Sequence, residues 1–154
     1  MTLPPLPPDF AEMLRELFDA NAEFLIVGAY AVGAHVQPRA TQDLDIWVRA
    51  TPENAVRVWR ALARFGAPLH ELTLDDLSAP GIVFQIGRAP NRIDILTTIS
   101  GVTFDEAWPE RVIADIGGES YPVLGRNALM TNKRASGRQK DLIDLDLLEK
   151  FSKP

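Results

Sequence analysis

The run 43-DLDIWV-48 most constrains how this chain folds, because it places two carboxylates inside a segment that otherwise has the pattern of a β-strand. Side chains alternate between the two faces of a strand, so Asp43 and Asp45 project from one face and the aliphatic residues between and after them from the other. The aliphatic face must be buried, whereas the acidic face must stay open to solvent or to a cation. The segment therefore predicts a sheet whose one face packs against the core while the other presents carboxylates to solvent or to a cation.

The chain has 154 residues, the length of one ordinary domain. The rest of the sequence contains both strand-like and helix-like segments. We expect an α+β fold in which helices flank a small mixed β-sheet and a C-terminal helix pair is broken at Gly137. Residues 1–154 form the expected single domain, with a proline-rich extended lead-in over 1–8. Expected strands lie at 23–27, 43–49, 82–87 and 92–99, with two short ones around Gly117 and Gly118. Expected helices lie at 10–21, capped by Asp9, and at 28–36, 53–65, 125–136 and 138–151, the last burying Leu142, Leu145 and Leu148 by their spacing.

Composition excludes several classes of protein. The chain has no cysteine, which removes disulfide frameworks and cysteine-based metal sites, and His35 and His70 lie far apart in the sequence. No apolar run is long enough for a membrane span, and the first residues lack a basic region followed by an apolar one. We therefore expect a cytoplasmic protein with no membrane partner. A net charge of −5 argues against bulk binding of nucleic acid.

A third carboxylate has the same pattern as the first two. Asp94 lies between two isoleucines in 92-RIDILT-97, so it also points away from an apolar strand face. If the two strands are neighbours, three carboxylates share one surface, and hard divalent cations take such oxygen ligands. In a two-metal site for phosphoryl transfer, Asp43 and Asp45 would hold the cations and Asp94 would accept a proton from an attacking hydroxyl. The plain alternative is a solvated strand face.

A glycine turn precedes the acidic strand. The strand 23–27 ends at Gly28, and a helix opening there would present free N–H groups to a phosphate. The dinucleotide fingerprint fails because Tyr30 replaces its middle glycine, and the P-loop fails because Ala34 and His35 follow Gly33. Close packing of helix on sheet is the other explanation for these glycines.

A strand, a glycine turn, a helix, Asp-x-Asp on a second strand and an acid on a later strand resemble the nucleotidyltransferase superfamily, which includes DNA polymerase β-like enzymes. The matching residues are Gly28, Asp43, Asp45 and Asp94, and the segment 132–148 is similar to the lysine-bearing helix pair of its members. Within the superfamily, the chain most resembles minimal AbiEii-type toxins and related bacterial nucleotidyltransferases. It departs from them at Ala29, where members usually carry glycine or serine.

The resemblance implies Mg²⁺ or Mn²⁺ as cofactor and an NTP as substrate. It implies metal binding and catalysis by the three aspartates, with phosphate contacts from Gly28, Ala29, Arg39, Thr41, Lys133 and Arg138, and from Lys140 as a weaker choice. Lys133 is the first choice to contact the triphosphate. The basic residues could instead lie on a solvated face, paired with Asp141 and Asp144.

Two functions follow as expectations. The first is Mg-dependent transfer of a nucleoside monophosphate from an NTP to a hydroxyl of an RNA end, a protein or a small molecule such as an aminoglycoside. Such an enzyme could belong to a toxin–antitoxin pair and have a cognate antitoxin as partner. The second is a catalytically weak or inactive NTP-binding regulatory module of the same fold, with Ala29 marking a decayed phosphate turn.

Overall fold

The computed structural model describes residues 2–3, 6–37, 43–88 and 90–151. Its centre is a seven-stranded sheet in the order β1-β6-β7-β2-β3-β5-β4. The strands are β1 (Thr2–Leu3), β2 (Phe24–Val27), β3 (Asp43–Val48), β4 (Val83–Ile86), β5 (Arg92–Leu96), β6 (Val112–Ile116) and β7 (Glu119–Val123). β3 pairs with β5, β2 with β7 and β1 with β6 in parallel, while the other neighbours are antiparallel, so the sheet is mixed as predicted.

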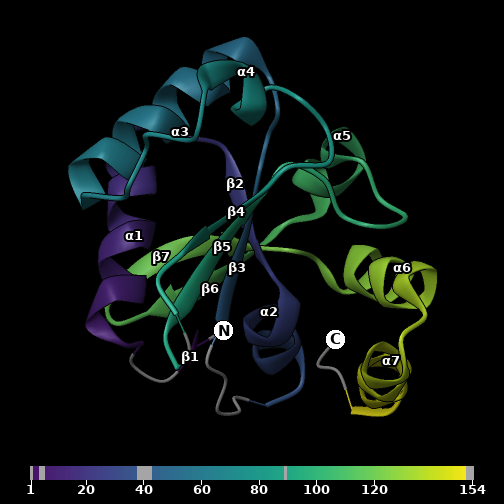
Figure 1. Cartoon of the computed structure of the whole chain (residues 1–154). Helices are drawn as coiled ribbons and strands as arrows, with labels where there is room; N and C mark the ends of the chain where they lie inside the picture. Colours follow the sequence, from purple (N-terminus) through teal and green to yellow (C-terminus); the bar gives the residue numbers. More distant parts are fainter. Residues whose placement is uncertain (1, 4–5, 38–42, 89, 152–154) are drawn as a thin grey trace.

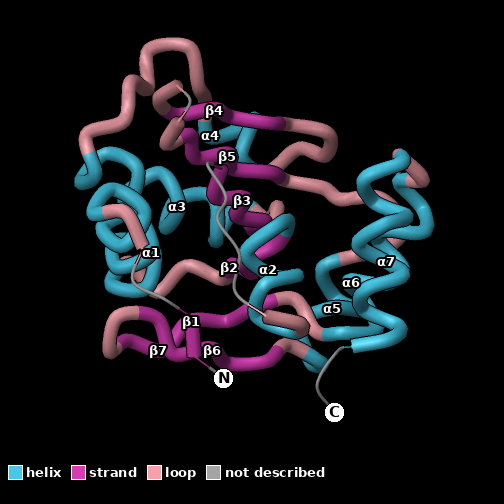
Figure 2. The backbone as a smooth tube through the Cα atoms, turned by 90° about the horizontal axis from the view of Figure 1, so that it is seen from below, coloured by secondary structure: helices cyan, strands magenta, loops and turns pink. Residues whose placement is uncertain are grey.

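Helices cover the sheet on both sides. α1 and α3 lie on one side, and α6 and α7 lie on the other beside α2 (Figures 1 and 2). The helices are α1 (Pro8–Asp19), α2 (Gly28–His35), α3 (Pro52–Phe65), α4 (Leu74–Leu77), α5 (Phe104–Ala107), α6 (Arg126–Ser136) and α7 (Gln139–Phe151), with a 3₁₀ turn at Trp108–Glu110. No helix in the described part of the chain is both long enough and apolar enough to cross a membrane.

The apolar face of β3 forms the centre of the core, as its alternation predicts. Leu44, Ile46 and Val48 are fully buried beside the inward faces of α1 and α3. α3 begins where the sequence places it, because the Thr51 hydroxyl accepts a hydrogen bond from the Asn54 N–H. It ends at Gly66, whose left-handed conformation (φ 91°) suits a residue without a Cβ.

Several predicted details differ in the structure. The strand expected at 92–99 ends at Leu96. Asp9 lies in the first turn of α1 and does not cap it, because the helix begins at Pro8, inside the expected lead-in and two residues before the predicted start. In α7, Leu148 is buried as expected, but Leu142 is 49% exposed and Leu145 only half-buried. The side chains that α7 buries with Leu148 are Asp141 and Asp144, because they meet a buried lysine on α6.

Candidate active site

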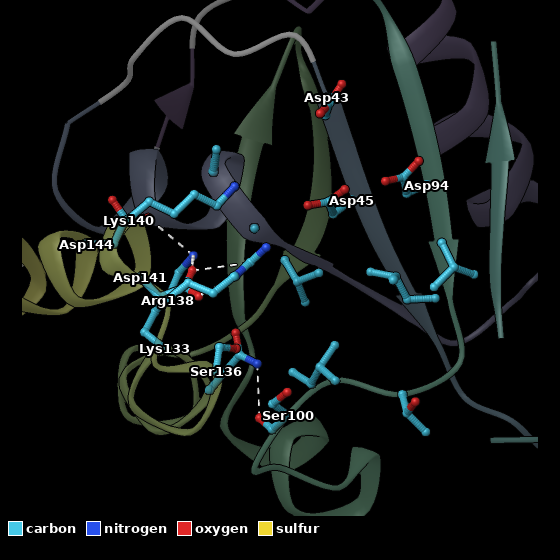
Figure 3. Close-up of a pocket in the computed structure, with 18 of the residues that line it drawn as sticks. Asp43, Asp45, Asp94, Ser100, Lys133, Ser136, Arg138, Lys140, Asp141 and Asp144 are labelled. Atoms are coloured by element: carbon cyan, nitrogen blue, oxygen red, sulfur yellow. Dashed lines mark hydrogen bonds and ion pairs between the residues drawn. The ribbon is translucent and has the colours of Figure 1, made fainter. Parts of the chain in front are cut away.

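The parallel pairing of β3 with β5 brings the predicted carboxylates to one face of the sheet. Asp45 is the register partner of Asp94, and Asp43 is the partner of Arg92. Residues paired in this way project from the same face, so all three aspartates share one surface. They line a single cavity of about 650 Å³ between the sheet and the C-terminal helix pair (Figure 3).

The surface formed by Asp43, Asp45 and Asp94 is the acidic wall of the cavity, and the glycine turn at Gly28 lies directly against it. Gly28 is the first residue of α2 and adopts a left-handed conformation (φ 70°). A Cβ atom at Gly28 would lie 2.3 Å from Oδ2 of Asp45, which is shorter than any nonbonded contact allows. The absence of a side chain therefore lets the Asp45 carboxylate approach the N-terminus of α2, where the helix dipole favours negative charge.

Arg92 completes the acidic wall, although the sequence reasoning did not single it out. Its Nη2 lies 3.3 Å from Oδ2 of Asp43 and donates a hydrogen bond of 3.2 Å to Oδ2 of Asp94. Its Nε is 3.0 Å from Oδ1 of Asp94, yet the N–H is not aligned for a hydrogen bond, so the buried Oδ1 has no hydrogen-bond partner among the described residues. Strand alternation could have found Arg92, because it precedes Asp94 by two residues and therefore shares its face.

The surroundings of Asp45 disfavour the charged form of its carboxyl group. Burial is the largest cause that raises its pKa, and the nearby carboxylates of Asp94 and Asp43 raise it further, to about 6. Arg92 and Lys140 act in the opposite direction without cancelling the shift. A cation beside Asp45 would offset both the repulsion and the cost of burying the charge.

The acidic wall presents carboxylate oxygens, the donor type that a hard divalent cation prefers. Its donors are carboxylate oxygens, one buried oxygen of Asp94 accepts no hydrogen bond from described residues, and two of the three carboxylates already share the cationic guanidinium of Arg92. Within the described ranges, no group of three or more His, Asp or Glu side chains is arranged to hold one metal ion. In this conformation, Asp43 and Asp94 hold the guanidinium instead.

The opposite wall of the cavity comes from α6, α7 and the turn between them, and we call it the basic wall because Lys133, Arg138 and Lys140 line it. Lys133 is buried, and its ammonium group lies 3.4 Å from Oδ1 of Asp141 and 3.2 Å from Oδ2 of Asp144. The sequence left open that Asp141 and Asp144 pair with the basic residues, and this pairing is observed for Lys133. Its phosphate contact remains a prediction, and its visible contacts fasten α6 to α7.

Arg138 and Lys140 extend from the start of α7 toward the space in front of Asp45 (Figure 3). Arg138 donates to both oxygens of Asp141, at 2.7 and 3.3 Å, so this buried carboxylate fixes the direction of the guanidinium. Lys140 is exposed and lines the cavity without an ion pair to any described residue. It is the cation on this wall with the greatest freedom to meet a ligand.

Neutral polar groups also line the cavity. Asn132 and Ser136 belong to α6, Ser100 follows β5, and the Asn132 amide donates to the Ser100 carbonyl at 3.0 Å. Ala29 also lines the cavity, next to Gly28. Arg39 and Thr41, both predicted to bind phosphate, lie outside the described residues.

The histidine in α2 takes no part in this site. His35 is buried, and its Nε2 lies 2.8 Å from the carbonyl of Leu124. Burial lowers its pKa, which favours the neutral ring that donates to this carbonyl. Its contacts join α2 to the end of β7.

No family model and no curated protein matches the chain, but solved structures share its fold. The lincosamide antibiotic adenylyltransferase LnuA, in its lincomycin-bound form, superposes with a TM-score of 0.60 at 11% identity over 95% of this chain and 98% of the other. The antibiotic-resistance factor ANT(2″)-Ia gives 0.62 at 14% identity over 91% and 80%, and its complex with adenylyl-2″-tobramycin gives 0.59 at 15% over 90% and 84%. Likeness at such low identity establishes a shared fold. The chain thus has the fold of nucleotidyltransferases.

Proposed function

We propose that the protein transfers a nucleoside monophosphate from an NTP to a hydroxyl group of an acceptor. The observation that carries the proposal is one cavity with an acidic wall on β3 and β5 and a basic wall formed by α6, α7 and the turn between them. A nucleoside triphosphate complexed with a divalent cation has the matching charge pattern. The same fold is found in a lincosamide antibiotic adenylyltransferase and in an antibiotic-resistance factor.

Each wall has a defined part in this reaction. Asp43 and Asp45, with Asp94, would hold Mg²⁺ or Mn²⁺, which neutralises charge on the phosphates and polarises the phosphorus that is attacked. Arg138 and Lys140 would bind the outer phosphate oxygens, since charged donors form the stronger hydrogen bonds to such groups. Gly28 and Ala29 would offer backbone N–H groups at the start of α2, without the hydroxyl that a serine would supply.

The bond changes follow from this placement. The acceptor oxygen forms a bond to the α-phosphorus, the bond from that phosphorus to the bridging oxygen breaks, and pyrophosphate leaves toward the basic wall. Asp94 would take the proton of the acceptor hydroxyl. Basic side chains at the far wall offset the charge that develops on the leaving pyrophosphate.

The acceptor we favour is a small molecule with several hydroxyl groups. The cavity offers neutral hydrogen-bonding groups at Ser100, Asn132 and Ser136 beside its charged residues. The fold neighbours include a lincomycin-bound enzyme and a complex with an adenylylated tobramycin. An RNA end or a protein side chain, as expected from the resemblance to toxins, is the alternative acceptor.

The test is incubation of the purified protein with Mg²⁺ and each of the four α-labelled NTPs. Aminoglycosides, lincosamides, total RNA and cell lysate are the acceptors, and Asp43→Ala is the control. Label is expected on one acceptor class with the wild type and on none with the variant. Absence of label from every combination would overturn the proposal.

A non-catalytic NTP-binding module is the second candidate. It is favoured by Ala29, which offers no hydroxyl, and by Lys133, whose ammonium is already paired with two carboxylates. Nucleotide binding without label transfer would support it.

A further inference from the structure

Arg92 lies against two of the three carboxylates that are candidate metal ligands. Its guanidinium contacts the carboxylates of Asp43 and Asp94 with three nitrogen–oxygen distances of 3.0 to 3.3 Å. Because both aspartates are candidate metal ligands, the guanidinium and the metal would require the same oxygens.

The strand register fixes the position of Arg92 relative to the two aspartates. Arg92 begins β5, directly opposite Asp43 in the register and two residues before Asp94 on the same face. The backbone therefore holds the arginine next to both acids, while 35% of its side chain is exposed on the cavity side. A planar guanidinium forms directed pairs with carboxylates, but the side chains of Arg92 and Asp43 are both partly exposed, so the pair between them contributes little stability and can open.

We propose that Arg92 is a resident cation that competes with the divalent metal for Asp43 and Asp94 and is released into the cavity when the metal binds. This inference rests on the proposed function. The released guanidinium remains at the cavity wall, where it can meet an anionic group such as a phosphate. Metal binding would then increase the affinity for the polyphosphate, and polyphosphate binding would increase the affinity for the metal, by the same factor.

A competing internal cation has a measurable consequence. The apparent affinity for the metal falls in proportion to the fraction of molecules in which the carboxylates are free of Arg92. Removing the guanidinium should therefore tighten metal binding in the absence of any nucleotide. From the usual strength of partly exposed ion pairs, two of them correspond to a change of roughly tenfold.

The test measures Mn²⁺ binding by electron paramagnetic resonance of the free ion, without nucleotide, in the wild type, Arg92→Gln, Arg92→Lys and Arg134→Gln. Arg134 is the matched control, because its exposed guanidinium pairs with Glu149 at 3.6 Å and does not line the cavity. We expect about tenfold tighter binding in Arg92→Gln, an intermediate change in Arg92→Lys, which keeps the charge without the fork, and little change in Arg134→Gln. If Arg92→Gln does not fold, the Lys variant decides, because equal affinity of this variant and the wild type would overturn the inference.

The second measurement is the coupling between metal and inorganic triphosphate. In the wild type, triphosphate should tighten Mn²⁺ binding more than it does in Arg92→Gln, because only the wild type gains a released guanidinium. Equal Mn²⁺ affinity and equal coupling in both proteins would contradict the inference and leave the proposed transfer standing. Tighter Mn²⁺ binding without nucleotidyl transfer would support the inference and contradict the proposed function, whereas no Mn²⁺ binding in any variant would contradict both.

Discussion

The two walls of the cavity are built on different principles. On the acidic wall, the register of β3 and β5 fixes Asp45 beside Asp94, and their like charges are only partly offset. On the basic wall, helix packing fixes the side chains, and the buried carboxylate of Asp141 balances Lys133 and Arg138. The sheet therefore holds carboxylates whose repulsion is not fully compensated at the place where chemistry would occur. In the helix pair, the charged side chains mainly stabilise the packing of α6 against α7.

The largest expected contrast is in catalysis. Asp45→Asn should lower the rate of nucleotidyl transfer by about 10³-fold, because it removes an oxygen ligand that is worth several kcal/mol in the transition state. Lys140→Gln on the basic wall should lower it by about 10- to 100-fold, since a hydrogen bond from a charged group contributes less. Initial rates of label transfer give both values.

The control for these rates lies on the same helix. Lys150 pairs with Asp146 on the exposed side of α7 and does not line the cavity, so Lys150→Gln should leave the rate unchanged. An effect of Lys140→Gln larger than that of Asp45→Asn would reverse the roles assigned to the two walls.

The basic wall should show the largest effect on stability. Asp141→Ala leaves the ammonium of Lys133 buried with one of its two partners removed, which we expect to cost about 3–5 kcal/mol in free energy of unfolding. Glu149→Ala removes a partner of Arg134 at 3.6 Å on the exposed side of the same helix pair, and should cost less than about 1 kcal/mol. Urea denaturation measures both, and equal losses would contradict the structural role of the buried network.

On the acidic wall, removing a charge should instead stabilise the protein. Burial and the neighbouring carboxylates raise the pKa of Asp45 from 3.8 to about 6. Ionising Asp45 therefore costs more in the folded state than in the unfolded state, and this group lowers stability as the pH rises from about 4 to about 6. In EDTA, Asp45→Asn should be more stable than the wild type at pH 7.5 by at most about 3 kcal/mol.

The sign of this effect can be checked by its pH dependence. At pH values well below 3.8 Asp45 is protonated in both states, so the difference between the wild type and Asp45→Asn should disappear in thermal melts. A wild type that is more stable than the variant at neutral pH would show that the carboxylate is already well compensated.

The smallest expected effect concerns the turn that supports the acidic wall. Gly28→Ala combines a left-handed conformation with a steric conflict at Asp45, whereas Gly117→Ala combines a similar φ of 61° with open space around the new Cβ. The difference between the two variants isolates the steric term, which should be about 1–3 kcal/mol. Equal melting temperatures would show that Asp45 can move away from Gly28 without cost.

The sequence predicted the acidic wall better than the basic one, for a physical reason. Strand alternation has a strict period of two, so the common face of Asp43, Asp45 and Asp94 follows once the strands are neighbours. The neighbour relation itself is a long-range property and needed the structure. Arg92 obeys the same alternation and could have been included, but an arginine at the start of a strand gives no local sign that it will pair with the acids.

The basic wall could not be predicted from periodicity alone. The leucines of α7 indicate one buried face, yet Leu142 is exposed and Asp141 and Asp144 point inward. A buried ion network reverses the usual rule that the charged side of a helix faces solvent. Its position depends on Lys133, which belongs to the preceding helix.

The most direct test of the central claim is calorimetry with a non-hydrolysable analogue of each NTP. One cavity with an acidic and a basic wall predicts binding of one nucleotide per chain in Mg²⁺, with large losses of affinity in EDTA, in Asp43→Ala and in Lys140→Gln. Binding that is equally strong in EDTA and in both variants, or absent with every nucleotide, would contradict the account.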